Sequence, residues 1–137
     1  MIGLITTTAG EELLAQLSAA GGALTITRVQ VGSGTPESAA AAKALTALVM
    51  PQQMATSTTP VLSGTQASMI VEYRNNLNGG LQAGFTLSEF GVFGRIGESG
   101  SETLIFYGSL GENSQTVLPE SAGMDVHRFP IAWAITD

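Results

Sequence analysis

The segments FTLSEFGVF at residues 85–93 and TLIFYGSL at residues 103–110 decide how this chain folds. Both are rich in aromatic and aliphatic residues, which favours β-strands. The Gly/Ser-rich turn at residues 96–101 between them is too short for a crossover helix, so the two strands must pair antiparallel. Within the first segment, Phe85 and Leu87 share one parity whereas Phe90 and Val92 share the other. This change of parity predicts a bulge at Gly91.

Further strands are predicted on both sides of this pair. Residues 23–31 form a strand whose parity change predicts a bulge near Arg28, and residues 67–74 alternate as a half-buried strand. Residues 50–60 are weakly patterned and are expected to form an edge strand, and residues 115–118 a short extended piece. The last strand covers residues 124–136, with Phe129, Ile131, Trp133 and Ile135 on one face. Pro130 forces that strand to an edge or splits it, because proline cannot donate to the ladder.

Two helices are predicted in the first third of the chain. Thr8 and Glu11 have the spacing of a capping box, and Gly21-Gly22 ends the helix that follows. A second helix is expected from Pro36, with Thr35 as its cap, to about Leu48. Helix, strand, helix and then consecutive strands predict one α+β domain over residues 1–137. Its expected architecture is a mostly antiparallel sheet or sandwich with one or two N-terminal helices packed on one side.

Composition excludes several classes of protein. The 137-residue chain (14.1 kDa) has no cysteine, which rules out disulfides and thiolate chemistry. Its net charge is −6 with only five basic residues, so nucleic acid is not an expected partner. The uncharged run at residues 44–71 contains Pro51, Pro60 and Gly64, which argues against a membrane span, and no signal peptide is apparent at the start. Only 12% of the residues are charged, about half the usual share, which favours a protein packed against neighbours.

The search for chemistry finds no catalytic residue. His127 is the single histidine, and Asp125 lies two residues before it on the same strand face, which is too little for a triad or a metal site. The turn Gly32-Ser33-Gly34 lacks the third glycine of a dinucleotide loop, since position 37 is Glu37. The chain is therefore expected not to be an enzyme and to hold no cofactor and no metal.

Glu89 is the one carboxylate that needs an explanation. It lies inside an apolar strand, where an unpartnered charge is costly. Two explanations stay open: a salt bridge to Arg28, Arg74 or Arg128, or a contact with another subunit.

The order of four segments resembles a known family. These segments are ITTTAG at 5–10, LTITRVQVGSG at 24–34, FTLSEFGVF at 85–93 and LIFYGSLG at 104–111. Together they resemble the N-terminal, anchoring domain of bacteriophage tail fibre proteins of the tail-collar fibre type, over nearly the whole chain. The family's patterns TR-x-x-VG-x-G and L-x-E-x-G-x-F place Arg28, Gly32 and Gly34 in the first motif and Glu89, Gly91 and Phe93 in the second.

The resemblance implies a structural virion protein of a phage tail or phage-tail-like particle. It also implies a homotrimer, a location at the tail, baseplate or fibre base, and synthesis in the host cytoplasm. The implied partners are baseplate wedge or tail-tip subunits and the tail fibre shaft. Because the sequence ends at Asp137 without a shaft, the expected role is an adaptor or attachment subunit or a small baseplate subunit, and a fragment of a longer fibre stays open. The six motif residues are expected to be interaction or fold-defining positions. The uncharged tract at residues 51–64 is expected to be ordered by a partner.

A glycan-binding module is the alternative. Sugar sites combine exposed aromatic rings with amide side chains, and Tyr73 beside Asn75, Asn76 and Asn78 offers both. A hairpin loop explains the asparagines equally well.

Overall fold

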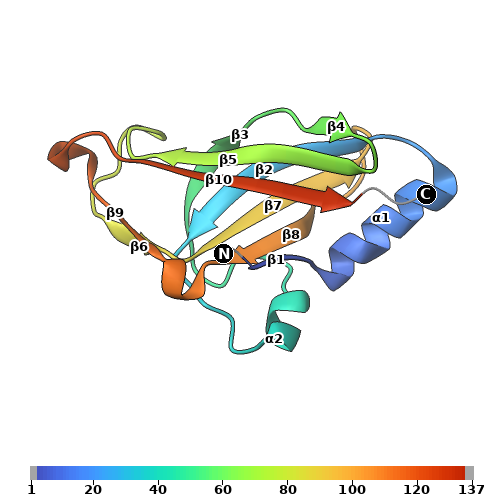
Figure 1. The fold of residues 1–137 in the computed structure, drawn as a ribbon, viewed down its shortest axis with the longest axis horizontal. Helices are drawn as coiled ribbons and strands as arrows, with labels where there is room; N and C mark the ends of the chain where they lie inside the picture. Colours follow the sequence, from blue (N-terminus) through green and yellow to red (C-terminus); the bar gives the residue numbers. More distant parts are fainter. Residues whose placement is uncertain (1–2, 135–137) are drawn as a thin grey trace.

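The computed structural model describes residues 3–134. The fold is dominated by one large antiparallel sheet (Figure 1). Seven strands follow the order β1-β8-β7-β2-β3-β5-β10, and β4 pairs with β5. Every strand pairing is antiparallel. The strands are β1 (Gly3–Thr6), β2 (Leu24–Gly32), β3 (Pro51–Ser57), β4 (Val61–Ser63), β5 (Gln66–Arg74), β7 (Glu89–Ile96), β8 (Thr103–Ser109) and β10 (Val126–Ala134). The predicted α+β class with a mostly antiparallel sheet is confirmed.

The sheet curls so that β10, at one end, faces β7 and β8 across the main core. Phe90 on β7 stacks on Phe129 of β10 with ring centroids 5.4 Å apart, and Phe106 on β8 lies 4.7 Å from Trp133 of β10. Burial alternates along β5 as the sequence predicts. The same is true of Phe129, Ile131 and Trp133, whereas Ile135 lies outside the described residues.

The strand β3 joins the two halves of this curled sheet. Its first part pairs with β2, and Thr56 and Ser57 pair with Glu72 and Val71 of β5. The expectation of an edge strand at residues 50–60 is therefore wrong, because β3 has a neighbour on each side. The expectation that a partner orders residues 51–64 is also wrong for β3 and β4, since both pair with strands of this chain.

A second, smaller cluster of buried side chains lies on the other face of β7 and β8. Phe93, Leu104 and Tyr107 point into it from these strands, and the segment that follows β2 covers it with Ala42 and Leu48. This arrangement buries both faces of β7, whose residues from Glu89 to Gly94 are all buried. The functional positions predicted on β7 therefore lie under a covering loop rather than on an open surface.

The helices differ from the predictions in their limits. The helix α1 spans Thr8–Ala20 and its cap is Thr7, whose hydroxyl accepts a 2.9 Å hydrogen bond from Gly10 N–H, so the expected Thr8 cap is one residue out. The helix α2 spans only Ala39–Lys43, capped by Ser38, instead of the expected Pro36 to Leu48. Just beyond the expected end at Leu48, the amides of Val49 and Met50 bond to Glu89.

The strands β2 and β7 contain register shifts. The predicted bulge near Arg28 is confirmed, since the β2–β7 register shifts between Ile26 and Arg28. The bulge predicted at Gly91 is wrong in place, because the register shift of β7 falls between Val92 and Phe93. The change of parity between Leu87 and Phe90 has a different cause. The chain leaves the separate ribbon of β6 (Phe85–Leu87) and β9 (Gln115–Val117) before it enters β7.

The last strand lies at one end of the sheet order. Within the described residues β10 pairs with β5 alone, so Pro130 is on an edge strand, as predicted. In Figure 1 the β6–β9 ribbon lies at the left-hand end and α1 at the right. Between β8 and β10 the chain forms two short 3₁₀ helices, η1 (Gly111–Asn113) and η2 (Glu120–Ala122).

Candidate functional site

The carboxylate of Glu89 is fully buried and accepts four hydrogen bonds. Its Oε2 atom accepts from Gly34 N–H at 2.9 Å and from Met50 N–H at 2.7 Å. Its Oε1 atom accepts from Val49 N–H at 2.9 Å and from the Tyr107 hydroxyl at 2.7 Å. Backbone donors and one phenol thus replace the water that burial removes from the carboxylate. We call Gly32, Gly34, Val49, Met50, Glu89 and Tyr107 the Glu89 lock.

The predicted salt bridge of Glu89 is wrong. Arg28 instead pairs with Glu102 at 2.8 Å, and both Arg74 and Arg128 contact Glu72. The reason lies in local geometry, because the backbone amides of two loops meet where β7 begins. A carboxylate so surrounded by N–H groups needs no guanidinium to be satisfied.

Tyr107 is a permanent donor in this cluster. Burial raises the pKa of the Tyr107 phenol, and both the hydrogen bond to Glu89 and the repulsion by its negative charge raise it further. The hydroxyl therefore stays protonated over the physiological range and keeps its bond to Glu89. The lock consequently ties β8, β7 and the loops after β2 and α2 into one unit.

Gly32 and Gly34 pack so closely against Glu89, Val49 and Met50 that a side chain at either position would clash. A Cβ atom at Gly32 would lie 2.5 Å from both Glu89 Oε2 and the Met50 carbonyl oxygen. A Cβ atom at Gly34 would lie 2.5 Å from Cβ of Val49 and 2.7 Å from the Met50 amide nitrogen. The two glycines are thus required for close approach of the two loops.

The other three motif residues lie beside the lock. A Cβ at Gly91 would lie 2.5 Å from a terminal methyl of Leu48, so this glycine makes room for the covering loop. Phe93 is buried in the small cluster, and the guanidinium of Arg28 lies 3.7 Å above its ring. The structure therefore brings together Gly32, Gly34 and Glu89 as one group and Arg28 and Phe93 as another. All six have evident structural roles.

Sequence reasoning missed Tyr107, Val49 and Met50. Tyr107 lies opposite Gly91 in the β7–β8 register, which a hairpin alignment of the two strands could have suggested. Nothing in the pattern of residues 44–50 signals that the amides of Val49 and Met50 point inward. Their side chains point the other way, 44% and 53% exposed. The lock thus holds two adjacent apolar side chains at the surface on a fixed backbone.

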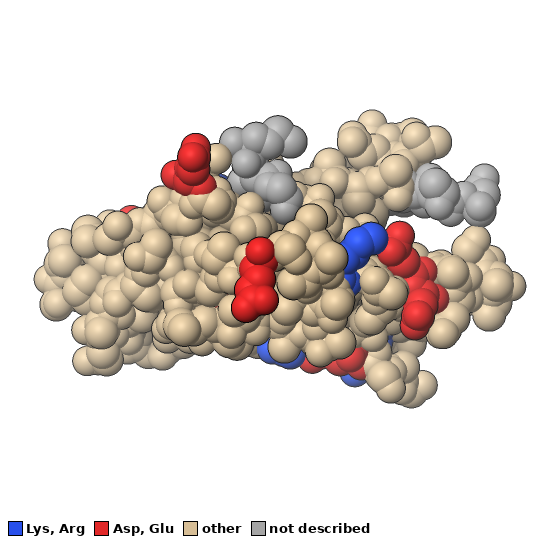
Figure 2. Space-filling view, turned by 90° about the horizontal axis from the view of Figure 1, so that it is seen from below, with Lys and Arg blue, Asp and Glu red and all other residues tan. Residues whose placement is uncertain are grey.

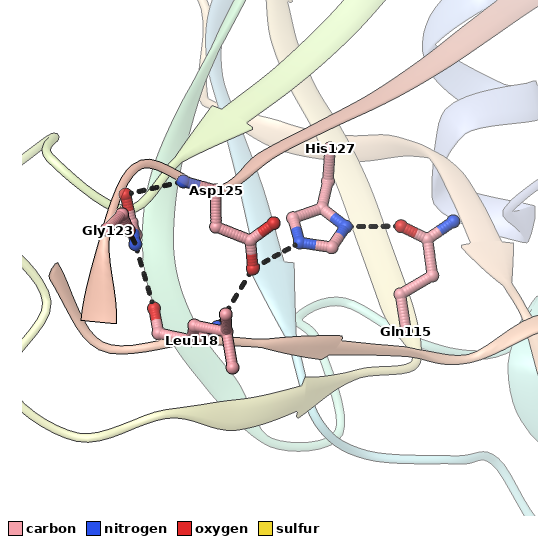
Figure 3. A network of polar contacts seen from close by, with 6 residues as sticks. Gln115, Leu118, Gly123, Asp125 and His127 are labelled. Carbon is pink, nitrogen blue, oxygen red and sulfur yellow. Dashed lines mark hydrogen bonds and ion pairs between the residues drawn. The ribbon is translucent and has the colours of Figure 1, made fainter.

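A second polar network ties the β6–β9 end to β10 (Figure 3). Nε2 of His127 lies 3.0 Å from Oδ2 of Asp125, and Nδ1 contacts Oε1 of Gln115. The same Asp125 oxygen accepts from Leu118 N–H at 2.9 Å. Burial acts to raise the pKa of Asp125, but these contacts more than offset it and the pKa lies below its usual value.

Buried Asn75 completes this network. Its amide nitrogen donates to the carbonyls of Leu118 and Gly123 at 3.0 and 2.8 Å, and its Oδ1 accepts from Asp125 N–H at 3.0 Å. His127 has only 9% of its side chain exposed, so the network holds loops together rather than presenting a reactive group. Among residues 3–134, no group of three or more His, Asp or Glu side chains lies close enough together to hold a metal ion.

Tyr73 cannot serve as the sugar platform of the alternative hypothesis. Its ring is fully buried and packs against Phe85 with centroids 5.9 Å apart. Asn75 is buried as well, with its side chain committed to backbone groups. The glycan-binding hypothesis thus loses its aromatic platform and Asn75, whereas Asn76 and Asn78 are exposed.

The surface seen in Figure 2 is mostly neutral, with a few charged groups, some of them next to groups of opposite charge. Over residues 3–134, no helix has the length and apolar character needed to cross a membrane. No family model, curated protein or solved structure matches this chain.

Proposed function

We propose that this chain is a structural virion protein of a phage tail or phage-tail-like particle, acting as an attachment or adaptor subunit between baseplate and tail fibre. The observation that carries the proposal is the Glu89 lock, which contains three of the six motif positions and fixes the backbone of Val49 and Met50. Two apolar side chains held on a rigid backbone are favourable for a protein interface, because little conformational entropy is lost when they are covered.

The contact surface of this proposal consists of Val49 and Met50. Methionine is flexible and polarisable, and it adapts well to the surface of a partner. Charged residues are few around the chain as a whole, which lowers the desolvation cost of packing against neighbours. Baseplate wedge or tail-tip subunits and the fibre shaft are the proposed partners, and the proposed assembly of the chain itself is a homotrimer.

The first experiment asks whether the chain is part of a particle and whether Met50 holds it there. Particles assembled with the Met50→Glu variant are compared with particles carrying the unchanged chain, and the subunit is quantified by mass spectrometry. We expect the unchanged chain to be present and the variant to be depleted at least about tenfold, since burying an unpaired carboxylate costs more than 1.4 kcal/mol.

Met124→Glu is the matched control, because Met124 is also exposed (64%) but lies far from the lock along the chain. Both variants must unfold at the same denaturant concentration as the unchanged chain. Equal incorporation of the Met50→Glu and Met124→Glu chains would refute the proposed contact surface. Absence of the unchanged chain from particles would refute the virion function itself.

A further inference from the structure

The main sheet has two open ends, β1 and β10, within the described residues. An edge strand presents N–H and C=O groups that can pair with a strand of another molecule, which leads to uncontrolled association. A subunit that must form defined contacts therefore needs protection at both ends. The structure shows a different device at each end.

The hydrogen bonds of Ile70 establish which groups of β10 face outward. Ile70 on β5 donates its N–H to the Thr58 hydroxyl at 2.9 Å, and its carbonyl accepts from Thr58 N–H at 3.0 Å. The backbone of Ile70 is thus directed away from β10. Since Ile70 lies opposite Pro130, these two form a non-hydrogen-bonded pair, and the backbone of Pro130 is directed to the open side.

Pro130 therefore stands in the middle of the open edge. Residues of the same parity, such as Arg128 and Ala132, also direct their N–H and C=O groups outward. Proline has no N–H, so an incoming strand would leave one carbonyl without a donor at the centre of the pairing. This missing donor separates the edge into two short pieces on either side.

At the other end, Lys43 covers β1. The Thr7 N–H donates to the Ile105 carbonyl at 2.9 Å, so the alternation of the ladder directs the backbone of Thr6 away from β8. The ammonium group of Lys43 donates to the Thr6 carbonyl at 3.0 Å and is held by Glu11 at 2.6 Å. One of the outward carbonyls of this short strand is thus already bonded.

We propose that Pro130 and Lys43 prevent a second copy of this chain from adding to the ends of the main sheet. The two ends of the main sheet are then closed to an added strand. The proposal is independent of the proposed function, because it concerns the ends of the sheet rather than Val49 and Met50.

The test at β10 restores the missing donor. Pro130→Thr introduces an N–H and a strand-favouring side chain, whereas Ala132→Thr adds the same side chain on the same edge without adding a donor. Light scattering after size-exclusion chromatography measures the mass of each over a range of concentrations. We expect the measured mass of Pro130→Thr to be about twofold or more that of the unchanged chain. The mass of Ala132→Thr should equal that of the unchanged chain.

Pro130→Ala restores the N–H without β-branching and keeps the test valid if Pro130→Thr does not fold. An association of Pro130→Ala equal to that of the unchanged chain, in a folded variant, would overturn the role of Pro130. Association of Ala132→Thr to the same extent as Pro130→Thr would also overturn it, because the added side chain alone would then be the cause.

The test at β1 exposes the Thr6 carbonyl. Lys43→Met removes the ammonium group but keeps most of the side chain, and Glu11→Gln removes the ion pair but leaves Lys43 beside Thr6. We expect only Lys43→Met to increase the measured mass. If a folded Lys43→Met variant has the same mass as the unchanged chain, the hydrogen bond to Thr6 does not protect the edge.

Discussion

The hydroxyl of Tyr107 donates a 2.7 Å hydrogen bond to the carboxylate of Glu89, and both side chains are fully buried. The bond links β8 to the start of β7 at the point where two loops converge. Because buried carboxylates are costly unless fully hydrogen-bonded, this contact is expected to contribute to the stability of the whole fold.

The two tyrosines of the chain make a matched pair for testing that contribution. Tyr107→Phe removes one of four donors from Glu89 and should lower the free energy of unfolding by about 1–3 kcal/mol, measured by urea denaturation. The hydroxyl of Tyr73 is buried without a hydrogen-bond partner among the residues described. Tyr73→Phe should therefore be neutral or slightly stabilising, and an equal loss in both variants would show that ring packing, not the bond to Glu89, is being measured.

Alkaline pH should destabilise the protein through the same two residues. Burial raises the pKa of Tyr73 and of Tyr107 above the usual value near 10. The folded state therefore retains protons that the unfolded state releases, so stability is intact below about pH 10 and falls as the pH rises further.

Ultraviolet absorbance of tyrosinate and circular dichroism report the two processes separately. Tyrosinate should appear only together with loss of folded structure, because neither phenol ionises readily in place. Ionisation of one tyrosine near pH 10 in protein that stays folded would contradict the raised pKa values.

Glu89→Gln tests the charge of the lock. An amide keeps one acceptor oxygen but turns its NH₂ group toward backbone N–H donors, which leaves buried donors without partners. The free energy of unfolding should fall by about 3 kcal/mol. Glu37→Gln is the control, because Glu37 is exposed and close in sequence to Gly34. A difference within about 0.5 kcal/mol between the two variants would show that the charge is not needed.

The strands were predictable from the sequence because strand burial follows a period of two. The alternation of residues 67–74, the antiparallel pairing of residues 85–93 with 103–110 and the edge position of Pro130 all follow from local pattern and turn length. Three of the four donors to Glu89 were not predictable, because they are backbone amides in loops separated from it by 39 to 55 residues. Every residue except proline has a backbone N–H, so no side-chain pattern in the sequence shows which amides will bond to Glu89.

The length of α2 illustrates the same limit. The run of alanines and the lysine favour a helix, and local propensity extends it to about Leu48. The structure ends the helix at Lys43. Leu48 is instead buried with Phe93 and Leu104, and the amides of Val49 and Met50 bond to Glu89. Tertiary contacts thus override propensity at the place where the candidate interface is formed.

Asp125 should give the protein an acid-sensitive contribution to stability. Its pKa is lowered in the fold, so the folded state favours the ionised carboxylate. The contribution is therefore present above the unfolded pKa of about 3.9 and is lost as the pH falls through the lower folded value. Asp125→Asn keeps an oxygen that can accept from Leu118 but removes the charge beside His127, so the variant should be less stable by about 1 kcal/mol at neutral pH.

The comparison of the two chains across pH isolates this effect. The stability difference between Asp125→Asn and the unchanged chain should shrink as the pH falls below about 4, because the carboxyl of the unfolded chain then takes up a proton. It should vanish only below the lowered folded pKa, where the carboxyl is neutral in both states. Urea midpoints measured from neutral to acidic pH give the difference directly. A difference that stays constant over this range would mean that the carboxylate acts only as a neutral acceptor for Leu118 N–H, and that the charge of Asp125 plays no part in holding β10 to the loop before it.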